Sequence, residues 1–327
     1  MINLPIEGIN VKRNSISRAL WTILMTIATG VAVLLGASGP AQASASAGDL
    51  GVSAVASDPL LFYRSSDGLA VTGSVDNGGN FTSLQGVGGF SLGWTHVTSV
   101  GGGRVLFYRA SDGLAVTGAV SNVGGFVNLQ TVGGFSPGWT HITSVGGGRL
   151  LFYRASDGLA VTGVVTSVGG FANLQTVGGF SPGWTHITSV GGGRVLFYRA
   201  SDGLAVTGAV SNVGGFTNLQ TVGGFSPGWT HITSAGGGRL LFYRSGDGLA
   251  VTGSVDNGGN FTSLQGVGGF SLGWTHITSV GGGRVLFYRA SDGLAVTGAV
   301  SNVGGFTNLQ TVGGFTPGWT LVTLAST

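Results

Sequence analysis

Tryptophan, histidine, tyrosine and arginine recur through this sequence at one fixed spacing, and together they could bind a polar, ring-shaped ligand. Each of these residue types returns every 45 positions. An aromatic face can pack against the C–H side of a sugar ring, while planar polar groups pair with the sugar hydroxyls. The spacing therefore predicts a weak carbohydrate-binding site that is repeated along the chain.

The candidate carbohydrate-binding residues form four sets. The tryptophans are Trp94, Trp139, Trp184, Trp229, Trp274 and Trp319, and the histidines are His96, His141, His186, His231 and His276. The tyrosines are Tyr63, Tyr108, Tyr153, Tyr198, Tyr243 and Tyr288, and the arginines are Arg109, Arg154, Arg199, Arg244 and Arg289. Leu321 replaces the histidine in the last copy, so we expect five or six sites.

Structural roles compete with the binding role for the same side chains. The tryptophan of each repeat could instead be a core residue that packs between neighbouring units. Arg109 follows Phe-Tyr at the end of an expected strand, where it could pair with a turn aspartate of its own or the next unit. In an alternating strand Trp139 and His141 would share one face, so both would be exposed or neither. Each unit is expected to present Tyr108, Phe126 and Trp139 together as an aromatic set, with Arg104, Asn128 and Gln130 as further polar candidates.

The acidic residues argue against catalysis. Beyond residue 43 the chain has no Glu, and each unit offers one Asp in a Ser-Asp-Gly type turn, such as Asp112, with Asp76 and Asp256 as extras. Glycosidic cleavage uses two nearby carboxyl groups, and no unit encodes such a pair. Near-identical units also do not suit a single active site. We expect no enzyme, with a sialidase-like activity the least favoured alternative.

No cofactor or metal site is expected. The histidines are 45 residues apart, one per unit, and no Asp-x-Asp-x-Asp-Gly calcium loop occurs. The Asp76–Asn80 segment is typical of a turn. The Gly-Gly-Gly-Arg segment at Gly101–Arg104 has no lysine, so it is not a phosphate loop.

The elements that must position these residues are short strands. One unit contains the β-favouring runs Trp94–Val100, Arg104–Arg109, Leu114–Val120 and Phe126–Val132, separated by Gly-rich breaks and an Asp-Gly turn. Four strands in a repeat of about 40–45 residues are typical of a β-propeller blade. Six copies of Phe-Tyr-Arg, beginning at Phe62 and ending at Phe287, give six blades.

We therefore predict an all-β fold, a six-bladed β-propeller of four-stranded antiparallel blades, as a single domain over residues 49–327. The extra strand-like copy at Trp319–Ala325 is expected to complete the first blade and close the ring. A degenerate copy at Gly51–Val55 would lie beside it or fray. The alternatives are two tandem β-trefoils or a β-solenoid.

The first 43 residues are typical of a secretory signal. Lys12, Arg13 and Arg18 precede the apolar run Ala19–Gly36, and Ala41-Gln42-Ala43 provides a small-x-small cleavage pattern. Residues 44–48 then form a short linker, and the protein is expected to be secreted. An uncleaved membrane anchor is the alternative. The chain has no cysteine, so an exported fold must depend on packing and topology rather than disulfides.

Charge and composition exclude several classes of protein. Of the net charge of +3, residues 1–43 carry +2, and the remaining 11 Arg nearly balance 10 Asp, so no polybasic nucleic-acid surface is encoded. The 66 glycines show no period of three, and 42% hydrophobic residues argue against disorder. We expect glycans or glycoconjugates as partners, no nucleic acid, no membrane insertion after signal cleavage, and a monomer.

The Gly-Trp-Thr-His-Ile and Leu-Phe-Tyr-Arg motifs between Gly138 and Gly158 resemble the repeats of tachylectin-like β-propellers. The resemblance extends over residues 49–327. It implies binding of N-acetylated sugars at several equivalent pockets, with the Trp and Tyr positions as the residues carried over. This chain has six units where the founding lectin type has five. A non-glycan adhesion or structural propeller is the competing hypothesis, in which the repeats serve folding alone.

Overall fold

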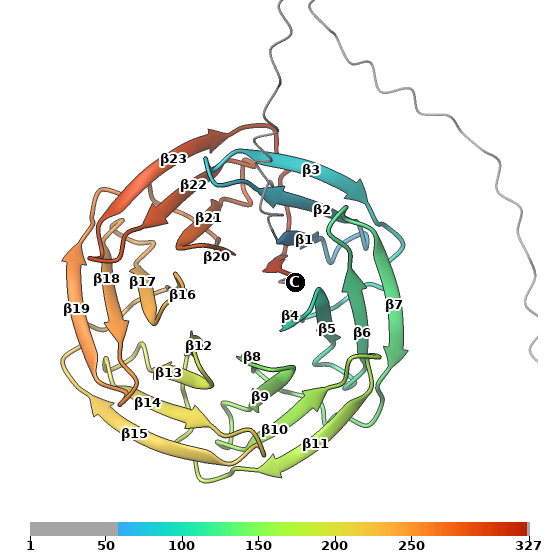
Figure 1. Cartoon of the computed structure of the whole chain (residues 1–327), viewed down its shortest axis with the longest axis horizontal. Coiled ribbons are helices and arrows are strands. Elements are labelled where there is room, and N and C mark those ends of the chain that lie inside the picture. The colour runs from blue at the N-terminus through green and yellow to red at the C-terminus, as the bar shows by residue number, and fades with distance from the viewer. Residues whose placement is uncertain (1–57, 326–327) are drawn as a thin grey trace, which may run out of the picture. The chain divides into compact units, whose positions relative to one another are not determined.

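Six four-stranded antiparallel sheets are arranged around a central channel in a computed structural model that describes residues 58–325 (Figure 1). Every regular element in this range is a β-strand, and the six-bladed propeller expected from the repeat is confirmed. The leader, the linker and Gly51–Val55 lie outside the described residues. Within the described residues, no helix has the length and apolar character needed to span a bilayer.

The blades are named A to F in chain order, and their strands are given from the channel outward. Blade A contains β24 (Leu321–Leu324), β1 (Pro59–Tyr63), β2 (Ala70–Val75) and β3 (Phe81–Gly86); blade B contains β4 (His96–Gly101), β5 (Arg104–Tyr108), β6 (Ala115–Val120) and β7 (Phe126–Thr131). Blade C contains β8 (His141–Gly146), β9 (Arg149–Tyr153), β10 (Ala160–Val165) and β11 (Phe171–Thr176); blade D contains β12 (His186–Gly191), β13 (Arg194–Tyr198), β14 (Ala205–Val210) and β15 (Phe216–Val222). Blade E contains β16 (His231–Ser234), β17 (Arg239–Tyr243), β18 (Ala250–Val255) and β19 (Phe261–Gly266); blade F contains β20 (His276–Gly281), β21 (Arg284–Tyr288), β22 (Ala295–Val300) and β23 (Phe306–Val312).

The hydrophobic core lies between neighbouring blades. The second strand of each blade is buried along nearly its whole length, as in β5, whereas the outermost strand is mostly exposed. One core cluster joins Leu106 and Tyr108 of blade B to Trp139 and Phe152 of blade C. Because each blade buries one face against each neighbour, the apolar residues of one repeat are covered only when the ring is complete.

A glycine in the third strand allows the outermost strand to pack closely. In β6, a Cβ at Gly118 would lie 2.2 Å from the ring of Phe126 on β7. The register between these strands shifts between Thr117 and Gly118, as in a β-bulge. Only glycine leaves room for the phenylalanine ring to lie across the sheet at this point.

The C-terminal strand closes the ring, as the sequence predicts. β24 pairs antiparallel with β1, with Phe62 opposite Val322, and takes the innermost place in blade A. Backbone N–H of Ala325 also donates to the carbonyl of Pro59, at 2.7 Å. Blade A is thus built from both ends of the described chain (Figure 1).

One local expectation was wrong. The innermost strands begin at the histidine, so Trp139 lies in the loop before β8 instead of alternating with His141 along it. Trp139 is buried, whereas His141 is half-buried. The two residues therefore differ in exposure and do not act as a pair on one strand face.

Candidate functional site

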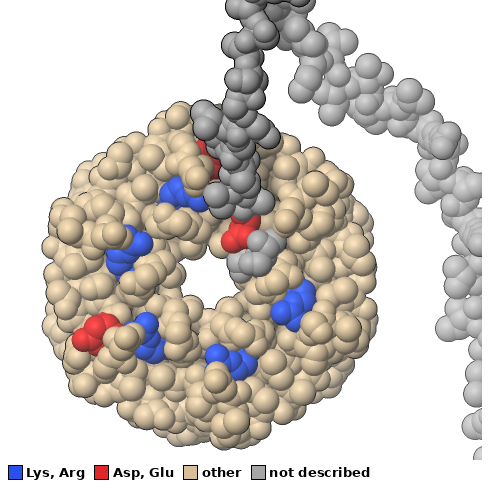
Figure 2. All heavy atoms as spheres, in the orientation of Figure 1, with Lys and Arg blue, Asp and Glu red and all other residues tan. Residues whose placement is uncertain are grey.

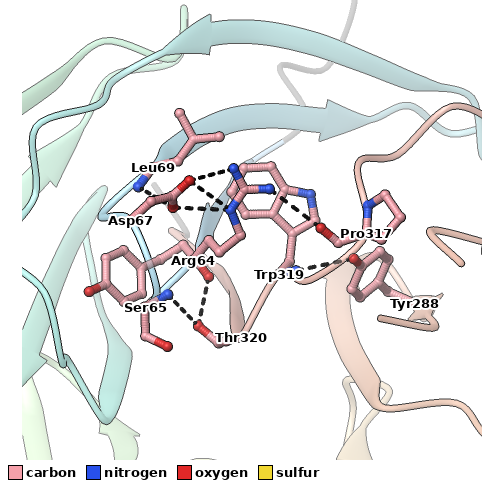
Figure 3. Close-up of polar contacts among 9 residues, drawn as sticks. Arg64, Ser65, Asp67, Leu69, Tyr288, Pro317, Trp319 and Thr320 are labelled. Atoms are coloured by element: carbon pink, nitrogen blue, oxygen red, sulfur yellow. Dashed lines mark hydrogen bonds and ion pairs between the residues drawn. The ribbon is translucent and has the colours of Figure 1, made fainter. Parts of the chain in front are cut away.

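The arginine that follows the second strand of each blade is held by the aspartate of its own turn and by the face of a tryptophan ring. Figure 3 shows this at the ring closure, where Arg64 donates from Nε to Asp67 at 3.0 Å and from Nη2 at 2.6 Å. The guanidinium lies over the ring of Trp319, 5.5 Å from its centroid. The Asp67 carboxylate also accepts from the backbone N–H of Leu69, at 3.1 Å.

The same arrangement occurs in all six blades. Arg109 pairs with Asp112 at 2.5 Å and lies over Trp94 at 5.7 Å. The guanidinium of Arg109, and then the N–H of Leu114, lower the pKa of the Asp112 carboxyl to about 2. The pairing of these arginines with the aspartate of their own turn is thus confirmed, and it leaves the guanidinium engaged on two sides.

The tyrosines tie one blade to the next. Tyr108 is completely buried, and its hydroxyl donates to the carbonyl of Ser136 at 2.8 Å and accepts from the N–H of Trp139 at 3.2 Å. Burial raises the pKa of the Tyr108 phenol. This side chain therefore fixes the loop that carries the tryptophan of the following blade.

The histidines link neighbouring innermost strands around the channel. His96 Nε2 lies 3.1 Å from the carbonyl of Thr140 in the next blade, and Nδ1 lies 3.0 Å from the hydroxyl of Thr95. A carbonyl can only accept, so Nε2 carries the proton and donates. Burial lowers the pKa of His96. No three metal-ligating side chains converge anywhere in residues 58–325.

Five equivalent hollows lie beside the loop that enters each of blades B to F, with volumes of about 310 to 530 Å³. The hollow of blade B is lined by the entering loop Val87–Ser91, by Trp94, and by residues of β5, β6 and the outermost strand β7. Pockets that bind small ligands commonly have volumes of 300–1,000 Å³. Each hollow is thus large enough for a monosaccharide or a short oligosaccharide.

Aromatic rings form one wall of each hollow. In blade B the centroid of Phe90 lies 4.7 Å from that of Phe126 and 5.1 Å from that of Phe107, and Trp94 lies 5.6 Å from Phe107. Blade A repeats the group with Phe81 and Phe315 at 4.6 Å. Phe90 and Phe126 are partly exposed, whereas Phe107 and Trp94 lie deeper.

Polar groups lie along the rim on the outermost strand. Asn128 and Gln130 of β7 line the hollow of blade B. Gln130 also donates from Nε2 to the carbonyl of Val168 in blade C, at 3.1 Å, which fixes its side chain. The indole N–H groups of Trp94, Trp184 and Trp274 are buried and have no hydrogen-bond partner within the described residues.

Of the four predicted sets, only the tryptophans line the hollows, and five of the six do so: Trp94, Trp139, Trp184, Trp229 and Trp274. The structure places the tyrosines in the core between blades, the arginines over the tryptophans and the histidines at the innermost strands. The hollow of blade B contains Trp94 together with Phe126, Asn128 and Gln130, which follow it in the sequence. Trp139 lines the hollow of the next blade. Sequence reasoning missed Phe90 and its Gly-Gly-Phe-Ser loop, although this segment also returns every 45 residues.

Comparison with known proteins identifies the fold. No protein-family model matches the chain, and no curated protein is similar to it in sequence. A putative 6-phosphogluconolactonase from Bacteroides fragilis superposes with a TM-score of 0.55 at 11% identity, over 82% of this chain and 98% of its own. The periplasmic gluconolactonase of Pseudomonas aeruginosa superposes with a TM-score of 0.52 at 15% identity, over 81% of this chain and 98% of its own. A protein from Lactobacillus plantarum superposes with a TM-score of 0.54 at 16% identity, over 78% of this chain and 82% of its own. At these identities the similarity extends to the β-propeller fold alone.

Proposed function

We propose that this protein is a secreted, non-catalytic β-propeller that binds carbohydrate at several equivalent sites. The observation that carries the proposal is the repetition of one aromatic-walled hollow in blades B to F. Because the surrounding loops repeat almost unchanged, each hollow offers a ligand the same aromatic wall, with asparagine at the rim in blades B, C, D and F and serine in blade E.

The chemistry of the hollow suits a sugar. A ring of C–H groups packs on the exposed edges and faces of Phe90 and Phe126, and hydroxyls pair with the amide of Asn128 and with the peptide groups of the Gly-Gly loop.

The tryptophans are the predicted binding residues that lie in these hollows. Tyr108 and Arg109 contact the tryptophans and hold them in place, so in this proposal they are positioning residues. His96 lies at the innermost strand and links blades. The proposal therefore assigns sugar contact to the tryptophan, the two phenylalanines and the outermost-strand polar residues.

Several weak sites on one rigid ring would favour polyvalent targets. Linked sites raise apparent affinity by about 10²–10⁴ when several bind at once, without any new contact. A glycan-coated surface, such as a cell wall or a glycoprotein layer, presents such a target. N-acetylated sugars are the first class to test because of the tachylectin-like motifs.

Natural variation among the blades provides a sharp test. The outermost strand has asparagine in blades B, C, D and F, and serine at the same register in blades A and E, at Ser83 and Ser263. The quadruple change Asn128→Ser, Asn173→Ser, Asn218→Ser and Asn308→Ser should leave the fold intact, since two blades already carry serine. We expect it to weaken binding on a glycan array at least about tenfold, because an amide that pairs with two hydroxyls is lost at four sites.

The matched control changes exposed residues of the same strands that do not line the hollows, through Val127→Thr and Ala172→Thr. This variant should bind as the unaltered protein does. No signal from well-folded protein on a high-valency array, or one binding site per chain by titration, would favour the structural or adhesion propeller instead. Turnover of a glycoside that a single Asp substitution abolishes would contradict the non-catalytic part of the proposal.

A further inference from the structure

A second set of arginines surrounds the channel mouth on the opposite face from the hollows. Arg104 begins strand β5 and Arg109 follows its end, so the two arginines lie at opposite ends of one strand and on opposite faces. The members of this second set, called here the arginine mouth, are Arg104, Arg149, Arg194, Arg239 and Arg284. Figure 2 shows basic side chains spaced around the central opening of this face.

Charge is distributed unequally between the two faces. On the hollow face, each of six arginines forms an ion pair of 2.5–2.6 Å with an aspartate, so that face is balanced. On the mouth face, the five arginines share the surface with three of the described aspartates. The Asp76 and Asp256 carbonyls accept from Arg284 and Arg194, and the Asp58 carboxylate lies near Gly281. The positive charge of residues 58–325 is therefore concentrated around the mouth.

Backbone carbonyls hold each guanidinium of the mouth in place. Arg149 donates from Nε to the carbonyl of Gly146 at 3.0 Å and from Nη1 to Val210 of the next blade at 3.2 Å. Arg239 likewise donates from Nε to Gly236 at 2.9 Å and from Nη1 to Val300 at 3.0 Å. Since carbonyls carry no net charge, these bonds orient the cations without neutralising them. Side chains ordered in advance lose less entropy when an anion binds.

The separate anchoring determines what kind of anion fits. Each arginine is tied to a different pair of blades, so the five cations cannot converge on one monovalent ion. A single exposed charge pair contributes little to binding and is screened by salt. We propose that the arginine mouth binds a compact multivalent oxyanion, a molecule that carries several phosphate or sulfate groups and bridges two or more of these arginines.

Blade A lacks the mouth arginine, and the turns of blades A and E provide a second variant. Pro59 takes the register position of the arginine, opposite Ser74 as Arg104 is opposite Ala119. The turns of blades A and E carry Asp76 and Asp256 where the others have Ser121, Thr166, Ser211 and Ser301. Ser121 Oγ accepts from the N–H of Gly125 as Asp76 accepts from Asn80, so serine is compatible with this turn.

The test is calorimetric titration of the whole chain with inositol hexakisphosphate and, separately, with sucrose octasulfate. The variant Arg104→Gln/Arg149→Gln/Arg239→Gln should weaken binding about tenfold or more. The control Val127→Asp/Ala172→Asp/Thr217→Asp lowers the net charge by the same amount at exposed residues of the outermost strands, away from the mouth, and should bind as the unaltered protein does. Asp76→Ser/Asp256→Ser should strengthen binding about threefold or more, which keeps the test valid if the triple mouth variant does not fold.

The outcomes distinguish a specific anion site at the arginine mouth from nonspecific electrostatic attraction. Binding of one probe and not the other assigns the phosphate or the sulfate class. Absence of binding by both probes, equal weakening in the two triple variants, or equal competition by inorganic phosphate at matched ionic strength would overturn the proposal. Glycan binding at the hollows is measured independently, so either proposal can fail without the other.

Discussion

At the scale of single residues, one buried threonine per blade joins neighbouring blades. Thr207 is completely buried on β14, and its hydroxyl donates to the carbonyl of Gly259 in the next blade at 2.7 Å. Gly259 has a φ of +84°, and a Cβ there would lie 2.6 Å from the threonine hydroxyl and 2.5 Å from Leu219 Cβ. The threonine and the glycine are therefore required together, and the contact recurs in every blade, with Thr297 reaching Gly79 across the ring closure.

Replacing this threonine should destabilise the propeller measurably. Thr207→Val keeps the shape but removes the donor, which leaves the carbonyl of Gly259 without this partner in a dry interface. We expect a loss of about 1–3 kcal/mol in the free energy of unfolding, measured by urea denaturation. Thr217→Val is the control, because Thr217 is exposed on β15 and blade B already has Val127 at that position. Equal stability of the two variants would contradict the role given to the threonine.

At the scale of elements, the innermost strands depend on a chain of histidine contacts. His96, His141, His186, His231 and His276 each reach a threonine carbonyl on the next blade at 3.0–3.1 Å, and the last of these is Thr320. Leu321 stands at the equivalent place in β24, so the contact between blades A and B lacks it. Five of the six junctions at the channel thus contain an uncharged imidazole.

These histidines should make stability depend on pH. Burial, the largest cause, lowers their pKa below the ordinary 6.5, while the carbonyl contact partly opposes it. The unfolded chain therefore binds more protons at mildly acidic pH, so the stabilising contribution is complete above about pH 6.5 and is lost as pH falls through the lowered values. We expect the melting temperature to fall between pH 7 and pH 5.

The matched variant changes all five histidines to leucine, the residue that β24 has at this position. Its melting temperature should change much less between pH 7 and pH 5, as followed by circular dichroism. The aspartates of the arginine pairs do not titrate in this window, because the pKa of groups such as Asp112 lies near 2. A variant that keeps the full pH dependence would show that other groups cause it.

The strands could be predicted from sequence, whereas the composition of the site could not. The 45-residue period, the β-favouring runs and the Gly-rich turns are local signals, and they indicated 24 strands and the closing role of β24. Phe126 lies in one hollow with Trp94 and not with Trp139, because each new sheet begins at the strand that follows a tryptophan. Packing between residues that are distant in sequence determines where a sheet begins. The exposure of Asn128 and the anchoring of Gln130 by the next blade are likewise long-range properties.

At the scale of the whole molecule, closure of the ring of near-identical repeats depends on one short strand, β24. Blades B to F are each continuous in sequence, but blade A obtains its innermost strand from the C-terminus. β24 contacts β1 in its own sheet and lies next to β20 and β4 in the neighbouring blades. Trp319, before β24, belongs to the core between blades F and A. Loss of this strand would expose apolar faces of two blades at once.

Removal of residues 319–327 should therefore disrupt the whole ring and not only blade A. Without β24 the first blade has three strands, and Leu60, Phe62 and Tyr288 lose their cover at the closing interface. Because blades bury their apolar faces only against neighbours, we expect a loss of several kcal/mol, a large share of the roughly 5–15 kcal/mol of a typical domain. Thermal unfolding would then begin far below that of the full chain. Removal of residues 326–327 alone is the control and should leave the transition unchanged, since the last described contact to Pro59 comes from Ala325. A melting temperature within a few degrees of the full chain after the longer deletion would mean that five complete blades are stable without closure, and that the repeats were selected for independent stability.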